Sequence, residues 1–125
     1  MTLEQTFLAL TAVGLIPVAL SYGASPFKMT KLLYKADIND NIAHIFRGIM
    51  GIYLAMITAW LLGTFSSTFT LPALFTLVFF MYGVAFGRII SFVQEKRVHA
   101  LFYLYLILEI ILGSIGLYLL VTQGR

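Results

Sequence analysis

Ionisable side chains within apolar stretches are the residues of this sequence that could do chemistry. Arg47 and Arg88 bound the long uncharged run 48–87, and Glu109 is the one charged residue of the last apolar run. A charge at the centre of a membrane helix costs about 2.5–3.5 kcal/mol on insertion scales, so such a residue is a candidate for function. A carboxylate between two guanidiniums forms a cluster with net positive charge, which can receive an anionic headgroup.

Two more polar residues precede Arg47 at helical spacing. Asn41, His44 and Arg47 recur at every third position, which places them on one helix face. We therefore expect Asn41 and His44 to join Arg47, Arg88 and Glu109 in binding a ligand. One histidine inside a span does not make a metal site, and the sequence holds no phosphate-binding or metal-binding motif, so we expect neither a metal nor a cofactor.

The composition identifies the elements that must position these residues as membrane helices. Hydrophobic residues make up 61% of the 125 positions and charged residues 10%, whereas soluble domains are about 45–50% apolar and about 25% charged. A water-soluble enzyme and a DNA-binding domain are therefore excluded. The net charge of +3 indicates membrane topology and attraction to anionic lipid, and no nucleic-acid partner is expected. The absence of cysteine excludes disulfides and thiolate metal sites.

The apolar runs predict an all-α fold, a four-helix transmembrane bundle that forms a single integral membrane domain over 1–125. A span needs about 20 apolar residues. A turn over 63–70, rich in Ser and Thr, separates the second span from the third. The segment 26–40 is basic and amphipathic, which is typical of a helix at the cytoplasmic membrane surface. The predicted spans are 3–22, 41–62, 71–92 and 99–121.

The distribution of lysine and arginine predicts the orientation. Cytoplasmic connections carry an excess of these residues. The first and third connections are basic, while the opposite side has one arginine, so both connections should be cytoplasmic and both termini should lie outside. The residues concerned are Lys28, Lys31 and Lys35 in the first connection, Lys96 and Arg97 in the third, and Arg125 at the C-terminus.

Small residues at helical spacing continue the polar face of each predicted span. We expect the four faces to meet inside the bundle, so that Arg47, Arg88 and Glu109 converge in one layer. Glycine at such positions permits close contact between helix backbones. The expected packing glycines are Gly48, Gly51, Gly83, Gly87, Gly113 and Gly116, and the face of the first span is the weaker set Gly14, Pro17 and Ser21.

These polar and glycine positions resemble a family of small bacterial four-helix membrane proteins known only as a domain of unknown function. The motifs are Asn41-x-x-His44-x-x-Arg47-Gly48, Gly83-x-x-x-Gly87-Arg88-x-x-Ser91 and Glu109-x-x-x-Gly113. The resemblance covers nearly the whole chain and, more distantly, extends to the DoxX-like membrane proteins. It implies one domain in the bacterial inner membrane, with recurrent polar residues at Asn41, Arg47, Arg88 and Glu109. In that membrane, the termini that the basic residues place outside would be periplasmic. The resemblance implies no activity. The turn from Gln94 to Arg97 departs from the family, in which this turn is acidic and contains glycine.

Three functions remain open. In the first, the protein binds or transports an anionic amphiphile, such as a lipid or fatty acid, whose headgroup Arg47 and Arg88 hold. In the second, it is an assembly subunit, a dimer or trimer among the options, in which Arg47 and Glu109 tie two helices and the glycine faces meet a partner. In the third, it is a membrane enzyme that uses His44 and Glu109 as an acid–base pair on a lipid-like substrate. The sequence favours the first and leans against an enzyme.

Overall fold

Helices make up most of the described part of the chain. A computed structural model describes residues 2–95, 98 and 100–123. Four of the helices are long and apolar enough to cross a membrane, so the predicted fold is confirmed. The basic residues Lys96, Arg97 and Arg125, on which the orientation partly depends, lie outside the described residues, as does His99. The helices are α1 (Leu3–Gly23), α2 (Pro26–Tyr34), α3 (Asp40–Phe65), α4 (Ser67–Gln94) and α5 (Ala100–Gln123).

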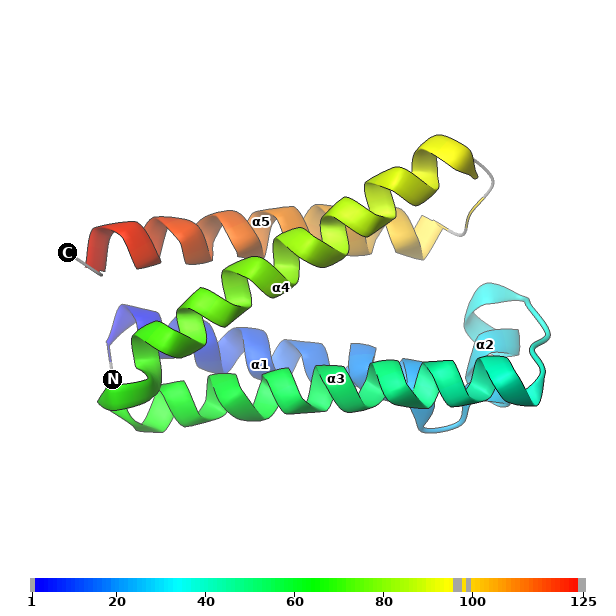
Figure 1. The fold of residues 1–125 in the computed structure, drawn as a ribbon, viewed down its shortest axis with the longest axis horizontal. Coiled ribbons are helices and arrows are strands. Elements are labelled where there is room, and N and C mark those ends of the chain that lie inside the picture. Colours follow the sequence, from blue (N-terminus) through cyan, green and yellow to red (C-terminus); the bar gives the residue numbers. More distant parts are fainter. Residues whose placement is uncertain (1, 96–97, 99, 124–125) are drawn as a thin grey trace.

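The long helices form two antiparallel pairs (Figure 1). α1 packs along α3, and α4 packs along α5, while α4 also crosses α3 diagonally. Among the described residues, the backbones of α3 and α5 do not pack against each other, with no Cα pair within 8 Å, and α1 meets α5 only sparsely. The start of α1, the α3–α4 turn and the end of α5 lie at one end of the molecule; α2 and the start of α5 lie at the other, which we call the α2 end.

Polar residues next to each apolar run define where the helices begin. Thr2 and Gln5 form a capping box, since the Thr2 hydroxyl accepts from the Gln5 amide and the Gln5 side chain accepts from the Thr2 amide. At α3, the Asn39 side chain accepts from the Ile42 amide at 2.9 Å. Both arrangements satisfy amides that the first helical turn leaves without a partner.

The turn between α3 and α4 is much shorter than predicted. The sequence predicts a turn over 63–70, but α3 continues to Phe65 and α4 begins at Ser67, so that only Ser66 is extended (φ −133°, ψ 119°). The Thr70 hydroxyl donates to the carbonyl of Gly63 at 2.7 Å. That carbonyl belongs to the last turn of α3, where the helix provides no partner. A hydroxyl-rich sequence therefore closes this turn rather than lengthening it.

The core lies where α1, α3 and α4 meet. Leu8, Trp60, Leu74, Leu77 and Met81 are fully or almost fully buried. The indole nitrogen of Trp60 in α3 donates to the Thr76 hydroxyl in α4 at 3.2 Å. In contrast, many large apolar side chains on the outside of the helices are exposed, as expected of surfaces that face lipid. Examples are Leu10, Phe65, Phe86, Val93 and Tyr118.

The basic amphipathic segment is helical over nine residues only. α2 ends where Lys35 adopts the left-handed conformation (φ 56°). The Tyr34 ring stacks on Phe102 of α5 with a centroid distance of 4.8 Å, which attaches α2 to the far pair of helices. Burial raises the pKa of Tyr34 to about 12, so its phenol is neutral at physiological pH. The predicted helix over 26–40 is therefore too long, although its lysines are exposed.

The glycines fall into two groups. Gly113 and Gly116 lie in the contact between α4 and α5, where an added Cβ would come within 3.0 Å of Tyr82 and 3.2 Å of Leu77, respectively. The other predicted packing glycines have no heavy atom within 4 Å of an added Cβ and are exposed. They do not mediate packing within the described chain. These glycines are Gly48, Gly51, Gly83 and Gly87.

Replacing a glycine of the α3–α4 hairpin should destabilise the protein. An added Cβ at Gly63 would lie 2.5 Å from the Ala73 Cβ and 3.0 Å from the Phe69 carbonyl oxygen. We expect Gly63→Ala to lower the free energy of unfolding by about 1–3 kcal/mol, because the clash requires a backbone shift. The control Gly51→Ala should raise it by up to about 1 kcal/mol through helix propensity. The free energy of unfolding of both variants can be measured in detergent titrations by the fluorescence of the single tryptophan, Trp60. Equal changes in the two variants would contradict the close packing at Gly63.

Candidate functional site

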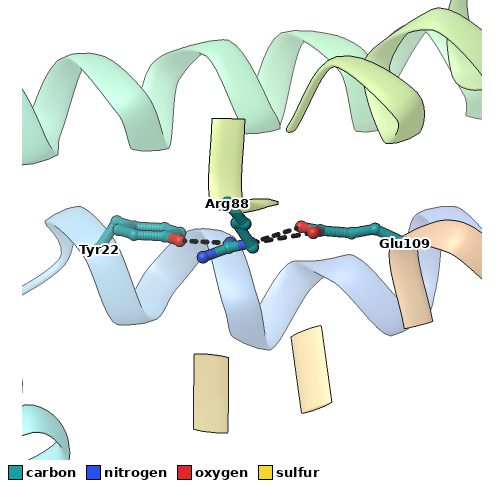
Figure 2. Close-up of polar contacts among 3 residues, drawn as sticks. All are labelled: Tyr22, Arg88 and Glu109. Carbon is teal, nitrogen blue, oxygen red and sulfur yellow. Dashed lines mark hydrogen bonds and ion pairs between the residues drawn. The ribbon is translucent and has the colours of Figure 1, made fainter. Parts of the chain in front are cut away.

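An ion pair between α4 and α5 forms the centre of the site (Figure 2). Nε of Arg88 donates to both carboxylate oxygens of Glu109, at 2.9 Å and 3.1 Å. The two side chains are only 13% and 11% exposed. Side chains lean toward the N-terminus of their own helix, so Arg88, near the end of α4, reaches back into the bundle and meets Glu109. These two sequence-predicted residues thus come together.

A tyrosine from α1 completes the cluster. Nη2 of Arg88 donates to the Tyr22 hydroxyl at 3.1 Å, and Figure 2 shows the guanidinium between Tyr22 and Glu109. The Tyr22 ring is held by Tyr53 of α3, with a centroid distance of 5.3 Å. Tyr22 is not among the residues predicted from the sequence, because one tyrosine near a helix end has no distinctive spacing. The only signal is its place beside Ser21, where the first apolar run becomes polar.

Two rings of α5 surround the guanidinium. The Cζ atom of Arg88 lies 5.3 Å from the centroid of the Tyr105 ring and 5.7 Å from that of Phe102. Ring faces attract cations within about 6 Å. Arginine suits such a site better than lysine, because a planar guanidinium can stack on rings and bind a carboxylate at once. The Arg88 charge is therefore compensated by one carboxylate and by aromatic faces.

The other predicted site residues lie outside this cluster. Asn41, His44 and Arg47 are exposed on α3, and the Cα of Arg47 lies beside Gly23, the last residue of α1. The prediction that Arg47 converges with Arg88 and Glu109 is therefore wrong.

The prediction for Arg47 fails because the other face of α3 packs inward. Helical periodicity groups residues on one face but does not say which neighbour that face meets. The inward face of α3 carries Ala43, Tyr53, Ile57 and Trp60, which are buried, and the polar face points away. The ion pair is consequently neutral, without the net positive charge that the sequence predicts.

The same geometry separates the residues of the two other hypotheses. Glu109 is paired with Arg88, and the exposed Arg47 forms no ion pair with it among the described residues, so Arg47 does not tie α3 to Glu109. His44 is exposed, whereas Glu109 is buried against Arg88. An acid–base pair of His44 and Glu109 is therefore wrong for this arrangement. In the part of the chain that the structure describes, no group of three His, Asp or Glu side chains could hold a metal ion.

Two cavities flank the ion pair. The first, the Arg88 cavity, has a volume of about 400 Å³ and takes part of its lining from the end of α4 and the start of α5. The second, the Glu109 cavity, has about 350 Å³ and lies between α1 and α5. Tyr53 lines both, while Arg88 lines the first and Glu109 the second. Both volumes fall in the range of small-molecule sites, about 300–1,000 Å³.

The comparisons with known proteins identify a family but no activity. A family model described as "Domain of unknown function (DUF4345)" matches residues 3–120. No curated protein and no solved structure matches the chain.

The ion pair predicts a strong coupling between Arg88 and Glu109. We expect Arg88→Gln and Glu109→Gln each to lower the free energy of unfolding by about 3 kcal/mol, because each leaves a buried charge without its partner. The double variant should lose less than the sum of the two. Arg47→Gln, on the exposed face, should change stability by less than about 0.5 kcal/mol. The free energies of unfolding of all four variants can be measured in detergent titrations. If the loss in the double variant equals the sum of the two single losses, Arg88 and Glu109 do not interact.

Proposed function

The chain belongs to the DUF4345 family, a domain of unknown function, and from the geometry of its site we propose that it binds an anionic amphiphile at Arg88. One observation carries the proposal. Arg88 is held in place by Glu109 and Tyr22 and also lines a cavity of about 400 Å³. The proposal keeps Arg88 from the sequence-based hypothesis and leaves Arg47 out of the binding site.

Arg88 has hydrogen-bonding capacity beyond its two partners. A guanidinium has five N–H donors. Nε binds Glu109 and one N–H of Nη2 binds Tyr22, while the remaining donors have no partner among the described residues. Two parallel N–H groups match the two oxygens of a carboxylate or phosphate. Arg88 can therefore bind such a group while its ion pair is kept.

The walls of the Arg88 cavity suit the apolar part of the ligand. Apart from Arg88, Ser91 and two tyrosine rings, the lining is apolar, with Ile49, Val84, Phe92 and Phe102 among its residues. A small hydrophilic anion would leave these walls unfilled. A fatty acid or a lipid with one anionic group matches both the charge and the walls.

The surroundings of the cavity favour the approach of an anion. α2, with its exposed lysines, lies at the same end of the molecule (Figure 1). Basic residues at a membrane surface attract anionic lipids. By the distribution of basic residues, we place this end at the cytoplasmic face of a bacterial inner membrane and both termini on the periplasmic side.

An assembly role is the second candidate. Gly48 and Gly51 on α3 and Gly83 on α4 are exposed and have open space beside their backbone. Such positions allow another membrane helix to approach closely. A dimer or trimer in native mass spectra that carries no small molecule would favour this role over ligand binding.

The orientation can be measured with single cysteines, since the chain has none of its own. Thr68, beside the α3–α4 turn, and Lys31 on α2 are both exposed. With an impermeant maleimide on intact spheroplasts, we expect Thr68→Cys to react and Lys31→Cys to react only after permeabilisation. The reverse pattern would contradict the proposed orientation.

Ligand binding can be measured by native mass spectrometry from mild detergent. We expect the protein to retain added palmitate or dodecyl phosphate, and Arg88→Gln to weaken this binding at least tenfold, about 1.4 kcal/mol. Arg47→Gln removes an exposed arginine outside the cavity and should retain the ligand as the unaltered protein does. Equal binding by the Arg88→Gln variant would refute the proposal.

A further inference from the structure

The Glu109 cavity differs from the Arg88 cavity in what it offers a ligand. It lies between α1 and α5, helices that contact each other only sparsely. Its lining is largely apolar and includes Leu10, Leu15, Leu108 and Ile115. Few of the lining residues are polar. Two of these, Thr11 and Glu109, indicate the same class of ligand.

Thr11 carries a buried hydroxyl that the protein does not satisfy. The residue is 4% exposed and lines the cavity, and its Oγ1 has no hydrogen-bond partner in the described part of the chain. In contrast, Thr58, Thr64 and Thr122 in the long helices each donate to the carbonyl four residues earlier, at 2.8–3.0 Å. A buried polar group without a partner is costly, and a ligand oxygen in the cavity would supply one.

Glu109 determines the charge of the ligand. Both carboxylate oxygens accept from Arg88, but each oxygen has a second lone pair that can accept another hydrogen bond. A ligand hydroxyl can donate to this carboxylate, whereas a carboxylate or phosphate group would be repelled by it. The Glu109 side of the ion pair therefore disfavours an anion, and a hydroxyl group is a donor from which this carboxylate can accept.

We propose that the Glu109 cavity binds an uncharged, largely apolar molecule that carries a hydroxyl group, with a long-chain alcohol as the simplest member of the class. The Thr11 hydroxyl donates to the ligand oxygen or the ligand hydroxyl donates to Glu109, and the chain lies against the apolar walls. This site is distinct from the Arg88 cavity and does not depend on anion binding there. The two sides of one ion pair thus select ligands of different charge.

Glycines in the lining allow each cavity to be filled separately. Gly14 lines the Glu109 cavity and Gly87 lines the Arg88 cavity, and an added Cβ at either meets no heavy atom within 4 Å. Gly51 has the same open space but lines neither cavity. Replacement of each by leucine gives a matched set, and Thr11→Val removes the buried hydroxyl while keeping the shape of the side chain.

The experiment is photolabelling of the full chain in detergent with a diazirine-bearing hexadecanol, followed by mass spectrometry of the labelled peptides. We expect labels on the residues that line the Glu109 cavity, displaced by unlabelled hexadecanol and at least tenfold less well by hexadecane or palmitate. Gly14→Leu and Thr11→Val should each reduce labelling about tenfold, while Gly87→Leu and Gly51→Leu should not reduce it.

Three results would overturn the proposal: no label in the cavity, equal competition by hexadecane, or labelling unchanged in Thr11→Val. The last variant keeps the proposal testable if Gly14→Leu does not fold. Loss of palmitate binding in Gly87→Leu with hexadecanol labelling kept would show that the two sites are separate. If palmitate does not bind at all, the proposed function fails while the hexadecanol result stands on its own.

Discussion

The requirement that a charge in a membrane be compensated determines how this protein is arranged. Arg88 on α4 and Glu109 on α5 are buried, so each needs the other. Tyr22 on α1 extends the same network to a third helix. α1 and α5 pack only sparsely against each other, and the hydrogen bonds to Arg88 connect them across the space that close packing would otherwise fill.

The cavities follow from the uneven packing of α4. Its first half carries the buried residues Leu74 and Leu77 and lies in the core, whereas its second half diverges from α3 (Figure 1). Arg88 stands in that second half, where space is available on both sides. The guanidinium of Arg88 lines one cavity and the carboxylate of Glu109 lines the other, so the two sides differ in electrostatic character although the pair itself is neutral.

The sequence was sufficient for the membrane helices and for placing Arg88 and Glu109 in one cluster, because both depend on the cost of polar groups in an apolar setting. The specific tie that it suggested, between Arg47 and Glu109, is not formed. The sequence did not predict the position of Arg47 correctly. Helical periodicity shows which residues share a face but not which helix that face contacts, and in α3 the face that carries the aromatic residues packs inward. The sequence also misplaced the α3–α4 turn, because Ser and Thr, which usually indicate a turn, here satisfied the end of a helix. Tyr22 had no pattern at all, and its role depends on a contact between residues 66 positions apart.

The α3–α4 turn has a mechanical consequence. With Ser66 as its only extended residue and Thr70 bonded across it, the turn fixes one end of α4 against α3. α4 is a rod of 28 residues, about 42 Å at 1.5 Å per residue. A tilt of about 5° at Ser66 would therefore move the far end of α4 by about 4 Å. A small change in crossing angle would thus displace the end where Arg88 lies by about the width of a methylene chain.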